Sequence, residues 1–123
     1  MRESSLWIWH IFAGLVILVL LGIHMFVMHL DAILAALGAP LENPIDATTV
    51  FERSRQAVFM ITYILLLGAA LYHGLYGLKN ILFELTLPKA LEKATAWLLT
   101  VAGLLLFAYG TYVAVFVFMT KEI

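Results

Sequence analysis

The chain has 123 residues, of which 64% are hydrophobic and only 12% are charged, against about 45–50% and about 25% in a typical globular domain. A soluble domain this small cannot bury so much apolar side chain, and the mean hydropathy is +1.03. The formal net charge of −1 gives no basic surface, so we expect no nucleic acid as partner, and with no cysteine the chain supplies no thiolate to a metal. The composition is that of an integral membrane protein.

The charged residues leave three long stretches that contain no Asp, Glu, Lys or Arg, namely residues 6–30, 56–78 and 94–120. A hydrocarbon core of about 30 Å takes roughly 20 helical residues to cross, and backbone groups in lipid are satisfied within a helix. The first stretch is too long for the apolar part of a signal peptide. We therefore predict an all-α integral membrane protein, with residues 1–123 as a single transmembrane domain of three helices at about these positions.

The segments between the predicted helices carry turn and cap signals. Residues 31–37 either prolong the first helix or lie in the membrane interface. Three residues then end regular structure: Gly38, Pro40 and Pro44. Before the third helix, Thr86 and Pro88 fit an N-cap and a first-turn position. Within the third helix, Gly103 and Gly110 belong to a stripe of small residues that is suited to helix packing.

The lysines and arginines divide between the two sides of the predicted bundle. With the N-terminus in the cytoplasm, one side receives Arg2, Lys79, Lys89 and Lys93, and the other receives Arg53, Arg55 and Lys121. Positive residues are more frequent on the cytoplasmic side of a membrane protein. The small excess favours a cytoplasmic N-terminus.

All four histidines fall inside or beside the predicted spans, where ionisable side chains usually mark function. His73 shares one face of the second helix with Gly77, one turn further on. A small residue beside a liganding imidazole gives a flat haem the clearance it needs. Alternatively, Gly77 permits close contact between two helices, and His73 forms a hydrogen bond across that contact. The sequence leaves both interpretations open.

The first predicted helix carries His10, Gly14 and His24 on one side, whereas His29 points elsewhere. His24 lies deep enough to need a partner, and haem iron would supply one. His10 and His29 lie near the interfaces, where contact with water or headgroups is the simpler interpretation. At about 1.5 Å per residue, His24 and His73 differ in depth by roughly 15–20 Å. They cannot bind one iron, so two ligands here would mean two haems at two levels.

Three segments resemble the membrane anchor cytochrome b subunits of succinate dehydrogenase and fumarate reductase. They are Trp9-His-Ile-Phe-Ala-Gly14, Leu21-Gly-Ile-His24-Met and His73-Gly-Leu-Tyr-Gly77-Leu-Lys79, and the resemblance covers nearly the whole chain. In the di-haem members, a three-helix unit gives one histidine from its first helix and one from its second. The resemblance thus implies that His24 and His73 are metal ligands of two haem b groups, each shared with a second membrane anchor subunit.

The resemblance also implies the surroundings of these groups. Gly14 and Gly77 would flank the cofactors, and Lys79 and His10 would contact haem propionates. Electrons would pass between an iron–sulfur subunit, which adjoins a flavoprotein subunit, and menaquinone or ubiquinone in the lipid of the cytoplasmic (inner) membrane. A chain of this kind performs no succinate chemistry itself.

The sequence does not decide at which end of the predicted bundle the quinone site lies. His29 and Asp31 are the first candidates, because quinone reduction needs proton donors near an interface. His10 and Trp7 at the other end are the alternative, which the mono-haem members of the family favour; in those members only the second-helix histidine is a ligand. Two different functions also fit three apolar helices with histidines: another respiratory cytochrome b subunit and a non-redox three-helix membrane scaffold.

Overall fold

The structure is a computed structural model and describes residues 2–38 and 46–120. All its regular elements in these ranges are helices: α1 (Arg2–Ala36), α2 (Ala47–Ser54), α3 (Ala57–Phe83) and α4 (Lys89–Met119). Glu3–Leu30 of α1, and the whole of α3 and of α4, are long and apolar enough to cross a membrane. Their 28, 27 and 31 residues extend about 40–47 Å, which exceeds the hydrocarbon thickness. The predicted all-helical architecture with three spans is confirmed.

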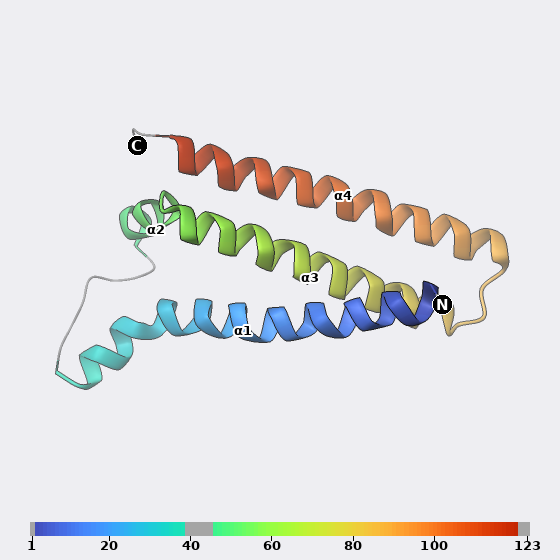
Figure 1. Ribbon diagram of the computed structural model, residues 1–123, viewed down its shortest axis with the longest axis horizontal. Coiled ribbons are helices and arrows are strands. Elements are labelled where there is room, and N and C mark those ends of the chain that lie inside the picture. The colour runs from blue at the N-terminus through green and yellow to red at the C-terminus, as the bar shows by residue number, and fades with distance from the viewer. Residues whose placement is uncertain (1, 39–45, 121–123) are drawn as a thin grey trace.

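The three long helices lie side by side in an antiparallel row with α3 in the middle (Figure 1). In the described residues, no Cα atom of α1 comes within 8 Å of a Cα atom of α4, so α3 joins the two. The short helix α2 packs against α3 and α4 at the end where α3 begins. The N-terminus lies at the opposite end, beside the end of α3 and the start of α4. The lysines of α3 and α4 therefore gather at the N-terminal end.

The apolar side chains of this row point outward. Among the described residues, Ala13 is the only buried hydrophobic residue, whereas large residues such as Leu18 and Leu98 are about 70% exposed, at 71% and 69%. Such a surface is stable against hydrocarbon or against other membrane helices, and it would be unfavourable in water. The fold is therefore that of a membrane-embedded layer without a closed core.

The helices continue beyond the stretches that lack charge. Residues 31–36 prolong α1, which was one of the two possibilities for this segment, and Gly38 follows with φ of 82°, in the left-handed region that favours glycine. Pro40 and Pro44 lie outside the described residues. The helix α2 was not expected. It begins after Asp46, whose side chain accepts hydrogen bonds from the backbone and the hydroxyl of Thr48.

The prediction that Thr86 and Pro88 begin the last helix is wrong. Thr86 has φ of 53°, and its N–H donates to the carbonyl of Phe83, so that Thr86 ends the turn that follows α3. Pro88 occupies the N-cap of α4, and Lys89 is the first helical residue. A proline keeps the preceding residue extended, so the chain cannot enter the helix before position 88.

Candidate functional site

The most closely organised group of polar residues lies where α1 packs against α3. The imidazoles of His10 and His73 stack face to face, with ring centroids 4.1 Å apart and planes 4° apart. His73 Nδ1 lies 3.0 Å from the backbone oxygen of His10. Because a carbonyl only accepts, this contact places the proton of a neutral His73 on Nδ1. His73 Nε2 makes no hydrogen bond to any described residue.

Two glycines make this close approach possible. A Cβ atom on Gly14 would lie 3.0 Å from His73 Cε1 and 3.1 Å from Nδ1, and one on Gly77 would lie 3.3 Å from His10 Cε1. Each helix thus contributes a histidine and a glycine four residues later. The two units oppose each other, with each glycine beside the other helix's imidazole. We call these four residues the histidine–glycine cluster.

The histidine–glycine cluster shows the helix contact that was one of the two interpretations of Gly77. In this chain Gly77 permits helix contact, and His73 forms its hydrogen bond across that contact. His10, expected to face water or headgroups, lies instead against His73 and is half-buried. The buried Nδ1 of His10 has no hydrogen-bond partner among the described residues. The register of α1 against α3, which the helical faces alone do not define, brings His10 to this position.

Tyrosines of α3 border the histidine–glycine cluster. The ring of Tyr76 lies 5.2 Å from that of His10, and Tyr72 stacks on Tyr76 with ring centroids 5.7 Å apart. The hydroxyl of Tyr72 donates to the backbone oxygen of Leu6 at 2.9 Å. These contacts hold the start of α1 on α3. Sequence reasoning missed them, although the spacing of Tyr72 and Tyr76 already placed both on one side of the helix.

His24 lies at a second level of the same helix pair. Its ring meets Tyr63 of α3 edge-on, with centroids 5.9 Å apart and planes at 78°. Tyr63 precedes His73 by ten residues, which is about 15 Å along the helix. The described residues contain no group of three His, Cys, Asp or Glu side chains that could hold a metal ion. His24 and His73 therefore lie at two separate levels of the helix pair, and at neither level do the described residues form a metal-binding group of three.

The far end of the helices carries the other candidates. His29 is exposed on α1, and Asp31 follows in the same helix, with a side chain that lies outside the described part of the structure. Arg53 of α2 is 8% exposed, and its guanidinium lies over the ring of Phe59 at 5.9 Å. It also contacts Met28 Sδ at 3.5 Å. A basic side chain thus packs against α1 and α3 at their far end, through Met28, which precedes His29 in the chain, and through Phe59.

Lys79 lies on the other side of α3, away from the histidine–glycine cluster. Its Nζ lies 4.9 Å from the centroid of the Tyr76 ring and 5.4 Å from that of Phe83. Tyr76 therefore contacts both His10 and Lys79 and stands between them. Lys79 lines a cleft of about 520 Å³ between α3 and α4. In the sequence, only the small residues Gly103 and Gly110 indicated that this helix pair packs closely. They do lie against α3, at Leu75 and Leu67 respectively, as the packing prediction requires.

Comparisons with known proteins identify the family. The model of the succinate dehydrogenase/fumarate reductase transmembrane subunit family matches residues 2–112. The chain is also 30% identical over 110 residues to the succinate dehydrogenase hydrophobic membrane anchor subunit of Archaeoglobus fulgidus, an alignment that covers 89% of this chain and 86% of that protein. No solved structure matches the chain significantly. The resemblance seen in the sequence is confirmed: this chain belongs to the succinate dehydrogenase/fumarate reductase transmembrane subunit family.

Proposed function

We propose that this chain is a haem-binding membrane anchor that passes electrons between the iron–sulfur subunit of a succinate dehydrogenase or fumarate reductase complex and a membrane quinone. The observation that supports it best is the state of His73. Its Nδ1 is held by the carbonyl of His10 at 3.0 Å, and its Nε2 is left unbonded. Metal-bound histidines commonly donate their second ring N–H to a carbonyl, which fixes the tautomer and the ring orientation. His73 has this arrangement on a membrane-spanning helix.

His24 is the second proposed ligand, about 15 Å further along the bundle. Each level offers one imidazole that could bind haem iron. At the level of His73, the ring of His10 is stacked parallel to that of His73, so the two rings do not face each other across a common iron. A second axial ligand at each level has to come from another chain, and the second anchor subunit is the partner proposed for that role. Haem b held by two nitrogen ligands exchanges electrons with no open position for oxygen.

The residue placement also supports an orientation and a quinone site. The end that carries the N-terminus and the lysines of α3 and α4 would face the cytoplasm and the iron–sulfur subunit, with the flavoprotein subunit beyond it, in the cytoplasmic (inner) membrane (Figure 1). Quinone reduction needs a side chain that exchanges protons near an interface. His29 is exposed, whereas His10 is packed into the histidine–glycine cluster. The His29 and Asp31 end is therefore the proposed site for menaquinone or ubiquinone.

A reduced-minus-oxidised spectrum of the purified complex, with haem extraction and an iron assay, tests this proposal. We expect two haem b groups per complex, loss of one in His73→Ala and loss of the other in His24→Ala. His29→Ala is the matched control for haem content: it should keep both groups and slow quinone reduction. Absence of haem b bands in the unaltered complex would overturn the haem proposal. One haem b per complex, unchanged in His24→Ala, would establish the mono-haem alternative, and two haems that both remain in His24→Ala would overturn His24 as a ligand.

A further inference from the structure

The cleft between α3 and α4 is an apolar space that the proposed electron path does not use. Its volume of about 520 Å³ falls within the range of about 300–1,000 Å³ found for small-molecule sites. Its walls are formed mainly by leucine, phenylalanine and glycine residues of the two helices, and three hydroxyl-bearing residues (Tyr72, Tyr76 and Thr100) and Leu6 of α1 also line it. A flexible hydrocarbon chain suits such a space, because it requires no polar partner along its length.

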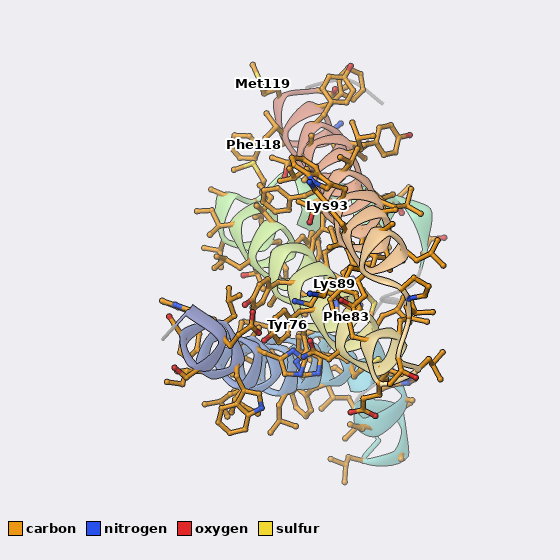
Figure 2. All side chains as sticks on the ribbon, turned by 90° about the vertical axis from the view of Figure 1, so that its right-hand side faces the viewer. Tyr76, Phe83, Lys89, Lys93, Phe118 and Met119 are labelled. Atoms are coloured by element: carbon orange, nitrogen blue, oxygen red, sulfur yellow. The ribbon has the colours of Figure 1, made fainter. Side chains whose placement is uncertain are left out.

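The N-terminal end of this cleft is basic. Lys79 is the only charged residue among those that line it, and Lys79 Nζ lies 5.4 Å from the Phe83 ring. Phe83 in turn lines a neighbouring hollow together with Lys89, Lys93 and one acidic residue, Glu92. Figure 2 shows Phe83, Lys89 and Lys93 where the end of α3 meets the start of α4, near Tyr76. We call Lys79, Lys89 and Lys93 the basic rim.

The charge of the basic rim is not neutralised by an ion pair in the part of the chain that the structure describes. Among the described residues, none of the three lysines forms an ion pair, and Glu92 is the one carboxylate that lines the hollow. Ala96 lines both the cleft and the hollow, so the two spaces adjoin each other along α4. The basic rim also lies at the end of the membrane spans, at the depth where lipid headgroups begin.

We propose that the cleft holds one acyl chain of an anionic phospholipid and that the basic rim binds its phosphate. Basic pockets between membrane helices recognise anionic headgroups in this way. A zwitterionic lipid would bring its own ammonium group to three lysines, and an uncharged quinone could accept a hydrogen bond from a lysine but could not form an ion pair with it. The proposal assigns Lys79 to a lipid phosphate instead of a haem propionate, in keeping with the Tyr76 ring between Lys79 and the histidine–glycine cluster.

The test uses the intact complex, stripped of lipid in detergent and exposed to equal amounts of phosphatidylglycerol and phosphatidylcholine. Native mass spectrometry then measures the lipid that each complex retains. We expect preferential retention of phosphatidylglycerol, with a fall of about fivefold in Lys79→Gln and again in Lys93→Gln, as expected for one lysine near an anionic headgroup. Arg55→Gln, at the opposite end of the molecule, is the matched control and should retain the lipid fully.

A second variant separates the cleft from the basic rim. Thr100 lines the cleft, and its hydroxyl is bonded to its own helix, so Thr100→Trp fills the space without removing a charge. It should reduce phosphatidylglycerol retention while the haem spectrum stays unchanged. Equal retention of the two lipids, or full retention in Lys79→Gln, would overturn the proposal. A changed haem spectrum in Lys79→Gln with unchanged lipid would assign that lysine to a propionate, and release of the lipid by a short-chain quinone would assign the cleft to quinone.

Discussion

Replacing Gly14 by alanine perturbs the histidine–glycine cluster at its narrowest point. The new Cβ would lie 3.0 Å from His73 Cε1 and 3.1 Å from His73 Nδ1, where ordinary contacts begin at 3.4 Å. The imidazole is a rigid ring, so it has to shift by a few tenths of an ångström. That shift acts directly on the 3.0 Å hydrogen bond between His73 Nδ1 and the carbonyl of His10.

The change in the free energy of unfolding follows from one stabilising and two destabilising contributions. Alanine gains up to about 1 kcal/mol of helix propensity over glycine. Weakening an interhelical hydrogen bond in a membrane loses about 0.6 kcal/mol, and overpacking costs about 1–3 kcal/mol. We expect Gly14→Ala to lower the free energy of unfolding by about 1–2 kcal/mol. Loss of the outer hydrogen-bond partner of a metal-bound histidine typically lowers metal affinity about 10–100-fold, so under the proposed function haem affinity should fall by up to this factor in Gly14→Ala.

Gly22→Ala is the matched control, because it lies on the same helix and a Cβ there meets nothing within 4 Å. Thermal unfolding in detergent and haem titration are measured on both variants. In haem-free protein, the imidazole ¹⁵N shifts of His73 should show the Nδ1–H tautomer in the parent and in Gly22→Ala, and a mixture in Gly14→Ala. If Gly14→Ala and Gly22→Ala behaved alike in all three measurements, the role given to the glycine would be refuted.

Two further changes test the packing around the histidine–glycine cluster and the cleft. Gly103→Ala places a Cβ 2.6 Å from Leu75 Cδ1, the end of a side chain that can turn aside, so we expect this contact to cancel part or all of the roughly 1 kcal/mol that alanine gains over glycine in a helix. Gly74→Ala, which meets nothing within 4 Å, should show that gain in full in thermal unfolding, and equal gains in the two variants would contradict the contact. Tyr72→Phe removes the 2.9 Å hydrogen bond to α1 and should cost about 0.5–1.5 kcal/mol, with faster hydrogen exchange at the start of that helix. Tyr76→Phe, whose hydroxyl has no hydrogen bond to a described residue, should leave exchange unchanged.

The membrane architecture could be predicted from the sequence because lipid excludes charge, and the positions of the charged residues therefore mark the spans. The contact between His10 and His73 could not. Periodicity shows that His73 shares a face with Gly77, but it does not show how far α1 slides along α3, and that register decides which residue of α1 meets the imidazole. The start of α4 was misplaced because Thr86 was assigned to the following helix, whereas its N–H closes the preceding turn.

The cleft between α3 and α4 could not be predicted from the sequence, for another physical reason. The small residues of α4 indicated close packing, and Gly110 lies against Leu67 as expected. Whether a helix pair leaves space elsewhere along its length depends on how all the facing side chains interlock. That property belongs to both helices together and has no signature in either one.

The placement of α3 between two helices whose backbones stay more than 8 Å apart has a thermodynamic consequence. Gly14 and Gly103 meet different side chains of α3, those of His73 and Leu75, so the effects of changing them should add, and a double-mutant cycle between Gly14→Ala and Gly103→Ala should give a coupling energy close to zero. Substitutions on α3 have no such independence, because they reach both neighbours. Selection can therefore adjust the imidazole side and the cleft side of this protein separately, provided that the changes fall on the outer helices.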